Sequence, residues 1–320
     1  MTNASLKTPS LKFALGGDRP VCRMGYGAMY LTGPGYWGPP ADPDAAVRLL
    51  RRAVDLGVNF IDTADAYGPD TNEQIIRRAL HPYPAGLVIT TKGGLLRSGP
   101  EDWTVQGHPY IVPCGRPAYL RQQVEMSLRN LGLERIELYQ LHRIDPAVPL
   151  ADQLGELARL REQGKIHHIG LSGQPEVTVE QLAKAREITE IAAVENLYNV
   201  ADRSGEKALR YAEQHGMAFI PWFPMGHGDL AKPGSVLSGL AKERGATPAQ
   251  LALAWLLHRS PSILAIPGTS SIKHLEENCR AADMKLDESE LAAIEDAAAA
   301  AKTWRPSTSE SGSAHTEETP

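Results

Sequence analysis

The stretch 59-NFIDTADAYG-68 decides the expected fold of this 320-residue chain. It begins as an apolar run, which is typical of a buried β-strand, but the run ends in Asp62, and Tyr67 follows in the next loop. Barrel enzymes build their sites where parallel strands end, so a strand that ends in a carboxylate predicts a β/α unit with a site at its carboxyl end. The sequence on both sides repeats the pattern.

Seven further apolar runs alternate with amphipathic segments of helical length, which is typical of β/α repeats. The eight expected strands are residues 23–27, 58–62, 86–91, 136–141, 167–172, 191–196, 217–222 and 262–267. Helices are expected between them, for example at 42–56, 116–132, 148–164, 177–188 and 247–260. Eight strands, each followed by a helix, predict an α/β fold of the (β/α)8 TIM barrel type rather than a doubly wound sheet. Before the first strand, Gly16 and Gly17 predict the turn of an N-terminal β-hairpin at 11–25.

One domain and a short tail are expected. Residues 1–302 contain no internal linker, so we interpret them as a single (β/α)8-barrel catalytic domain. From residue 303 to residue 320 the sequence is rich in Ser, Thr and Glu and offers little to bury. Such a composition predicts a disordered C-terminal tail.

Composition and charge argue against several classes of protein. Thirty-three basic and 38 acidic residues give a net charge of −5, which does not favour nucleic acid or an anionic membrane as a partner. Residues 1–13 contain no apolar h-region and no run of about 18 apolar residues occurs, so we expect neither export nor a membrane span. The three cysteines are widely spaced, which argues against a disulfide framework and predicts a cytoplasmic protein. The oligomeric state stays open, with a monomer favoured.

No metal site is expected from the sequence. The chain has no H-E-x-x-H motif and no clustered C-x-x-C motif. His167 and His168 are adjacent on an expected strand, and alternation would point them to opposite faces. That arrangement would prevent the two histidines from sharing an ion.

Four polar side chains are expected at one end of the barrel. Asp62, Lys92 and His142 each end a strand, and Tyr67 lies in the loop after the second strand. A tyrosine can protonate a carbonyl oxygen if its pKa, about 10 when unperturbed, falls toward the working pH. A nearby lysine ammonium lowers that pKa, an aspartate holds the lysine, and a histidine orients the carbonyl. Each residue alone is more often a cap or a loop residue, but the four together indicate carbonyl reduction.

From about residue 11 to residue 291 the sequence resembles the aldo-keto reductases, which are NADP(H)-dependent (β/α)8 enzymes. The similar motifs occur in the family's order and spacing: 59-NFIDTADAYG-68, 89-ITTKGG-94, 137-ELYQLHRID-145, 166-IHHIGLSG-173 and 266-IPGTSSIKHLEENCRA-281. The resemblance implies that Tyr67 is the proton donor and that Lys92 lowers its pKa. It further implies that Asp62 is the counter-ion of the lysine, that His142 orients the substrate, and that NADPH is the cofactor.

The cofactor contacts are inferred from this resemblance, since no G-x-G-x-x-G motif follows a strand and opens a helix. Ser172 matches the position that hydrogen-bonds the nicotinamide carboxamide, and Trp222 matches the aromatic position that stacks on the nicotinamide ring. Glu195 stands where the family usually has a glutamine, and an ionised carboxylate cannot donate a hydrogen bond. The other contacts expected near this end of the cofactor are Gly27, Ala28, Met29, Phe223, Met225 and His227.

The far end of the cofactor is expected on 267-PGTSSIKHLEEN-278, where a strand leads into a helix N-terminus that favours phosphate. The resemblance places the adenine against Glu277 and Asn278. Many family members hold the 2′-phosphate with a lysine and an arginine, whereas this chain has Gly268 and His274. NADH therefore stays an alternative to NADPH. The hydroxyl groups expected to contribute are those of Thr269 and Ser270.

The expected substrate is an aldehyde or ketone, with an aromatic or bulky compound favoured by the loop residues. Two long loops, 28–40 and 92–117, follow the first and third strands. The aromatic residues expected to line an apolar pocket there are Tyr30, Tyr36, Trp37, Trp103 and Tyr110. Loop aromatics are also common packing anchors, so that role stays open for them. Two other functions stay open as well: a reductase dedicated to one metabolite such as pyridoxal, and a regulatory subunit of the same fold that binds cofactor but serves a partner protein.

Overall fold

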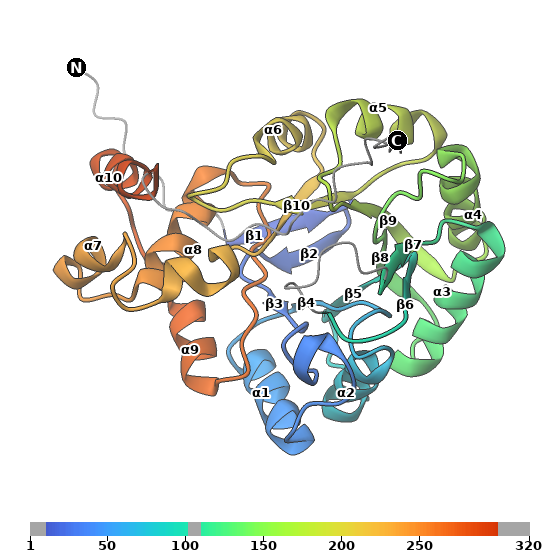
Figure 1. Cartoon of the computed structure of the whole chain (residues 1–320), viewed down its shortest axis with the longest axis horizontal. Coiled ribbons are helices and arrows are strands. Elements are labelled where there is room, and N and C mark those ends of the chain that lie inside the picture. Colours follow the sequence, from blue (N-terminus) through green and yellow to red (C-terminus); the bar gives the residue numbers. More distant parts are fainter. Residues whose placement is uncertain (1–10, 102–109, 300–320) are drawn as a thin grey trace, which may run out of the picture.

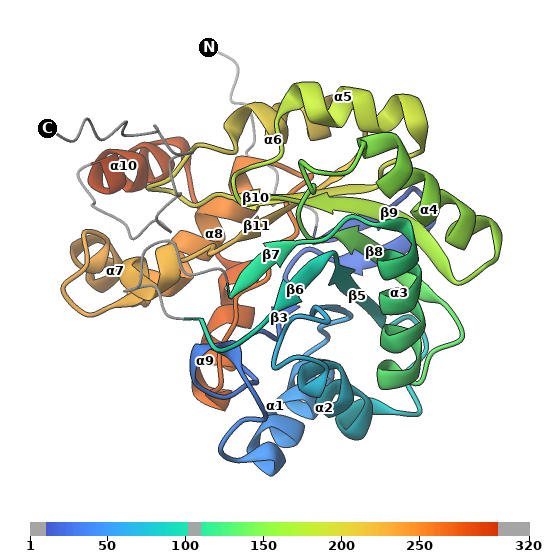
Figure 2. The ribbon, with the colours of Figure 1, turned by 45° about the vertical axis from the view of Figure 1, so that its right-hand side comes forward.

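A computed structural model describes residues 11–101 and 110–299 of the chain. Within these ranges, seven parallel strands form one curled sheet in the order β11-β10-β9-β8-β5-β4-β3 (Figures 1 and 2). The strands are β3 (Tyr26–Gly27), β4 (Phe60–Asp62), β5 (Val88–Gly93), β8 (Ile136–Leu141), β9 (Ile166–Ser172), β10 (Ala193–Leu197) and β11 (Ala218–Trp222). All seven overlap strands expected from the sequence.

An eighth segment closes the barrel without forming a regular strand. Residues 262–267 are expected as a strand, but they make only isolated parallel bridges to each side. The Ala265 N–H donates to the Arg23 carbonyl at 2.8 Å, and the Leu264 N–H donates to the Phe219 carbonyl at 2.9 Å. The segment is therefore hydrogen-bonded both to β11 and to the residues that precede β3. These bonds complete the (β/α)8 barrel that the sequence predicts.

Helices cover the outer face of the sheet, as Figures 1 and 2 show. Thr178 and Thr247 begin two of them with capping boxes, in which the threonine accepts from the N–H of Gln181 or Gln250 and the glutamine side chain bonds back. The α-helices are α1 (Pro43–Asp55), α2 (Thr71–Leu80), α3 (Pro117–Leu131), α4 (Leu150–Glu162), α5 (Val179–Ile188), α6 (Glu206–Gln214), α7 (Ser238–Glu243), α8 (Pro248–Arg259), α9 (Ile272–Arg280) and α10 (Glu288–Ala299). Short 3-10 turns occur at η1 (Pro34–Tyr36), η2 (Gly226–Ala231) and η3 (Ala281–Asp283).

The predicted hairpin, β1 (Lys12–Leu15) and β2 (Arg19–Cys22), covers the end of the barrel where the strands begin. Gly16 and Gly17 adopt φ angles of 60° and 85° in its turn, a backbone conformation that favours glycine. Leu15 and Val21 pack inside the barrel against residues from the surrounding strands. This interior cluster also contains Phe60, Val88, Leu138, Ala192, Ala193, Ala218, Ile220, Leu264 and Ile266. The hairpin is therefore the floor of the barrel.

The expectation that His167 and His168 point too far apart to share an ion is wrong. The Nε2 atoms of both imidazoles lie 2.7 Å from the carboxylate oxygens of Asp18, and the ring centroids are 4.2 Å apart. Alternation describes side chains above and below a sheet, whereas Asp18 belongs to the hairpin turn that covers the strand ends. Two neighbouring long side chains can therefore converge on it from either side of β9.

The long loop after β5 contains an antiparallel pair, β6 (Leu95–Arg97) and β7 (Ile111–Pro113), that the sequence analysis does not predict. Strands of three residues are too short to show the alternation on which a strand prediction depends. Trp103 and the tail expected at 303–320 lie outside the described residues. In the part of the chain that is described, no helix combines the length and apolarity needed to cross a bilayer.

Candidate functional site

The carboxyl ends of β4, β5 and β8 bring together the four polar residues singled out from the sequence. Lys92 Nζ lies 2.6 Å from Asp62 Oδ2 and 3.4 Å from the Tyr67 hydroxyl oxygen. It also donates to the Thr63 carbonyl at 3.2 Å. The side chains of Lys92 and Asp62 are almost completely buried, so little water separates the ammonium from its partners. The lysine is therefore fixed between a carboxylate and a phenol.

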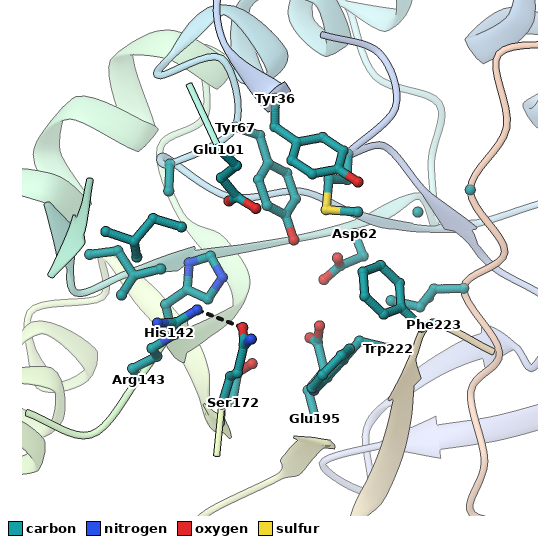
Figure 3. A pocket seen from close by; sticks show the side chains of 18 of the residues that line it. Tyr36, Asp62, Tyr67, Glu101, His142, Arg143, Ser172, Glu195, Trp222 and Phe223 are labelled. Carbon is teal, nitrogen blue, oxygen red and sulfur yellow. Dashed lines mark hydrogen bonds between the residues drawn. The ribbon is translucent and has the colours of Figure 1, made fainter. Parts of the chain in front are cut away.

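His142 directly follows β8 and faces the same space (Figure 3). Its ring meets the Tyr67 ring edge to face, with centroids 5.9 Å apart. Burial, followed by the charge of Lys92, holds the pKa of His142 well below its ordinary value, so the imidazole is neutral at neutral pH. Its Nδ1 is buried and has no hydrogen-bond partner among the described residues. A neutral imidazole carries one N–H and can donate one hydrogen bond to a ligand.

The Tyr67 hydroxyl keeps its proton at neutral pH. Burial raises the pKa of Tyr67 above its ordinary value of 10, and the Lys92 ammonium acts in the opposite direction. Lys92 thus contributes as the sequence analysis expects, but the loss of hydration outweighs it. The expected fall of the Tyr67 pKa is therefore not found in the structure, although the ammonium beside the hydroxyl would stabilise the phenolate that proton transfer leaves behind.

A second carboxylate, Glu195 at the centre of β10, faces the same lysine. Glu195 Oε1 lies 3.4 Å from Lys92 Nζ, and Glu195 Oε2 accepts from Gln140 Nε2 at 2.8 Å. Burial raises the pKa of Asp62 as well, but the Lys92 ammonium is closer to Asp62 than to Glu195 and opposes that shift, which favours the charge on Asp62. Burial, with the Asp62 charge adding to it, raises the pKa of Glu195 to about 8. At neutral pH Glu195 is largely protonated and can donate a hydrogen bond, as an amide does.

A pocket opens at the carboxyl ends of the strands (Figure 3). Trp222 and Phe223 lie across it from His142, with their rings edge to face at 5.0 Å. Trp222 Nε1 donates to the Gly173 carbonyl at 3.2 Å, which fixes the indole ring. The residues expected from the sequence that line this pocket are Gly27, Met29, Tyr30, Asp62, Tyr67, His142, Ser172, Glu195, Trp222, Phe223 and Gly268.

Charged residues on the pocket wall escaped the sequence analysis. Arg97 and Glu101 form an ion pair at 3.2 Å, and Arg143 donates to Gln174 Oε1 at 2.6 Å. All four line the pocket. Arg143 directly follows His142 at a strand end, and that position was a usable signal. Arg97 and Glu101 reach the wall from the long loop that contains β6, which the sequence does not predict.

A second cavity adjoins the first at Gly268, which lines both. Ser271 caps α9 at this cavity by accepting from the His274 N–H. The N-terminus of a helix favours an anion, and Lys273 adds a positive charge to the same wall. The residues expected from the sequence that line this second cavity are Met225, Gly268, Thr269, His274, Glu277 and Asn278. Together the two cavities form an elongated site whose donors suit a ligand with phosphate groups.

A few expected contacts are not found in either cavity. Ala28 is fully buried, and Ser270 is exposed on the loop before α9. Trp37 is exposed, whereas its neighbour Tyr36, which is also expected in the pocket, lines it. Tyr36 has a φ angle of 53°, and this turn of the backbone separates the directions of the two side chains. The side chain of His227 lies outside what the structure describes.

The sequence profile of the aldo/keto reductase family matches residues 23–299. The chain is 48% identical over 280 residues to an uncharacterized oxidoreductase of Schizosaccharomyces pombe, and the aligned region covers 88% of each protein. It is 44% identical over 285 residues to pyridoxine 4-dehydrogenase of Escherichia coli, and the aligned region covers 87% of this chain and 96% of that protein.

Solved structures share the fold over most of the chain. The glycerol dehydrogenase from Gluconobacter oxydans has a TM-score of 0.79 and 28% identity, covering 94% of this chain and 99% of that one. An aldo-keto reductase from Klebsiella pneumoniae, solved in complex with NADPH, has a TM-score of 0.73 and 27% identity, covering 89% of this chain and 94% of that one.

Proposed function

Because this chain belongs to the aldo/keto reductase family, we propose that it reduces an aldehyde or a ketone with NADPH and that Tyr67 donates the proton. The observation that carries the proposal is the set of contacts around Lys92. Its ammonium lies 2.6 Å from Asp62 and 3.4 Å from the Tyr67 hydroxyl, beside an open pocket. A protonated phenol next to a fixed cation is what the reduction of a carbonyl requires at the oxygen.

The two adjoining cavities fit a phosphate-bearing dinucleotide. Ser172, Glu195 and Trp222 would hold its nicotinamide end in the first cavity. Thr269, His274, Glu277 and Asn278 would hold the other end at the start of α9. NADPH, when bound, supplies the hydride that adds to the carbonyl carbon. NADH stays an alternative, since the positions of the family's usual lysine and arginine hold Gly268 and His274.

The residues of the chain act on the carbonyl oxygen. His142 is neutral and donates a hydrogen bond that directs this oxygen toward Tyr67. Tyr67 transfers its proton to the oxygen as negative charge develops there, so that one hydride and one proton convert the carbonyl to an alcohol. Lys92 stabilises the phenolate that is left behind, and Asp62 keeps the ammonium in place.

Replacing Tyr67 with phenylalanine tests the proton-donor role. Tyr67→Phe removes the hydroxyl group that would donate the proton and keeps the aromatic ring. We therefore expect kcat to fall by about 10²- to 10⁴-fold. NADPH binding should stay intact. The measurement is NADPH consumption with a panel of aromatic aldehydes and ketones, together with NADPH affinity by fluorescence titration.

Tyr139→Phe is the matched control, since the Tyr139 hydroxyl is also buried but has no hydrogen-bond partner among the described residues. Its turnover should stay within a few-fold of the wild type. Equal loss in both variants, or wild-type rates in Tyr67→Phe, would refute the assigned role. Tight NADPH binding without turnover of any carbonyl by the wild type would refute the reductase function itself.

A second candidate function is reduction of pyridoxal. The observation that favours it is the 44% identity to pyridoxine 4-dehydrogenase over 96% of that protein. The pocket wall carries Arg97, Glu101 and Arg143, so a substrate with ionisable ring groups would find charged partners there. We expect a dedicated enzyme to show a kcat/KM for pyridoxal at least about tenfold above that for benzaldehyde. Similar values for the two aldehydes would indicate broad specificity.

A further inference from the structure

A cluster of two histidines and one aspartate lies at the floor of the barrel, where the hairpin meets the start of β9. Asp18 Oδ2 is 2.7 Å from His167 Nε2, and Asp18 Oδ1 is 2.7 Å from His168 Nε2. The hairpin covers the amino-terminal ends of the strands, whereas Tyr67 follows the carboxyl end of β4. The cluster is therefore at the opposite end of the barrel from the candidate active site.

The donor atoms suit a divalent transition metal. Two imidazole nitrogens and a carboxylate oxygen are ligands that zinc accepts, with a water in the fourth position. The three donor atoms all lie within 4.8 Å of one another. Zinc binds such atoms at about 2.0–2.2 Å, so donors around a tetrahedral ion are roughly 3.3 Å apart. Side-chain shifts of about an ångström would open the two 2.7 Å contacts to that spacing.

The surroundings hold one ligand rigid and leave the others accessible. The His168 side chain is only 10% exposed, and a Cβ at Gly16 would lie 2.1 Å from its ring, so the hairpin turn packs directly on the imidazole. The carboxylate of Asp18 is 49% exposed and the His167 side chain 27% exposed, which gives an ion a path from solvent. A rigid ligand with two accessible ones favours binding without rearrangement of the backbone.

We propose that Asp18, His167 and His168 form a binding site for a divalent transition metal such as zinc. Asp18 is separated by 149 and 150 residues from the two histidines, so only the folded chain assembles the site. An ion there joins the hairpin floor to the barrel wall and stabilises the folded state by mass action. Its role is structural, and the proposal does not depend on the proposed reductase function.

Zinc titration of the full-length chain, free of any affinity tag and treated with a chelator, tests the site. We expect isothermal titration calorimetry with zinc chloride to show saturable binding of one ion and the melting temperature to rise with zinc. Asp18→Asn and His167→Gln each replace an exposed or partly exposed ligand, so each should weaken the affinity at least about tenfold. His215→Gln is the control, because His215 is an exposed histidine that ends α6 and lies outside the cluster.

The control variant should bind zinc as the wild type does. The site is refuted if wild-type protein shows no saturable zinc binding, or if both ligand variants bind with wild-type affinity. Melting temperatures without zinc show whether each variant is folded. Asp18→Asn preserves both imidazole rings and the hairpin backbone. It therefore still reports the effect of losing one ligand on zinc affinity if His167→Gln is unstable. Turnover is expected to be the same with and without zinc.

Discussion

At the scale of single residues, Glu195 is the departure from the family's usual residues with the largest physical consequence. Two buried carboxylates, Asp62 and Glu195, face one ammonium, and only one of them can keep its charge at low cost. The sequence shows that Glu195 replaces an amide, but it does not show the proton that Glu195 holds. That proton depends on burial and on the nearby charge of Asp62, which outweigh the opposing Lys92 ammonium and come together only in the folded barrel.

Glu195→Gln should change how stability depends on pH. The pKa of Glu195 is about 8 in the folded protein against an ordinary 4.5, so between these values the folded state binds more protons than the unfolded state. Stability from this group is therefore complete below about pH 4.5 and is lost as pH rises to about 8. We expect the free energy of unfolding of Glu195→Gln, relative to wild type, to increase across this window. Urea denaturation at a series of pH values measures it.

Asp62, Lys92 and Tyr67 face Glu195 in both proteins, and because Asp62 and Glu195 shift each other's pKa, the difference reports the titration of this carboxylate pair. Glu190→Gln serves as the control because Glu190 is exposed. Its difference from wild type should stay flat over the same pH range. A flat difference for Glu195→Gln as well would mean that Glu195 is ionised in the folded protein at neutral pH.

Residues at strand ends could be placed from the sequence, and residues in loops could not. Asp62, Lys92 and His142 are positioned by the barrel itself, since strand ends in a parallel barrel meet at one rim. Trp37 does not line the pocket in the structure and Arg97 was overlooked, because their directions depend on local backbone turns and on the β6–β7 pair. Such turns follow from tertiary packing rather than from periodicity.

At the scale of elements, the irregular eighth segment is held by a buried arginine. Arg23 precedes β3 and is only 1% exposed. Its Nε donates to the Ile263 carbonyl at 3.0 Å, and its Nη2 donates to the carbonyls of Leu257 and Ser260. Burial lowers the pKa of Arg23 to about 10, which still leaves it charged at neutral pH. The side chain thus supplies hydrogen bonds to a seam that has few ladder bonds of its own.

Arg23→Met should destabilise the protein while preserving most of the buried volume. Three carbonyl groups would lose a charged donor, and we expect the free energy of unfolding to fall by about 2–4 kcal/mol. The control is Arg48→Met, since Arg48 is 61% exposed and its substitution should cost less than about 1 kcal/mol. Urea denaturation of both variants gives the comparison. An equal effect of the two substitutions would contradict the role given to Arg23.

The sequence correctly places a β segment at 262–267, but this segment makes isolated bridges rather than the regular strand that was expected. An apolar run reports that a segment is buried, but it does not report how many ladder hydrogen bonds the segment makes. Here Arg23 takes the Ile263 carbonyl and so substitutes a side chain for a neighbouring strand. Nothing in the apolar pattern of 262–267 signals a partner 240 residues away.

At the scale of the whole molecule, stability depends on a floor that lies far from the chemistry. Leu15 is completely buried and packs with strand residues inside the barrel. Leu15→Ala should lower the free energy of unfolding by about 2–5 kcal/mol. Turnover at a temperature where the variant is folded should be unchanged, because the hairpin covers the end of the barrel opposite to the pocket. Urea denaturation and a carbonyl reduction assay measure the two quantities.

Leu96→Ala is the matched control for this substitution. Leu96 lies in β6 and is 46% exposed, so its truncation should change the free energy of unfolding by about 0.5 kcal/mol or less. If Leu15→Ala proves no more destabilising than Leu96→Ala, the hairpin does not contribute to the barrel core as described.

The closing segment also sets the timing of biosynthesis. Arg23 and Ile263, which meet at the seam, are 240 residues apart in the chain. At translation rates of about 5–20 residues per second, the edge of β3 waits roughly 12–48 s for its partner to be made. Throughout that interval the nascent chain presents an unpaired strand edge, the kind of surface that recruits other chains. The emerging polypeptide, rather than the finished barrel, is therefore the form of this protein most in need of a chaperone.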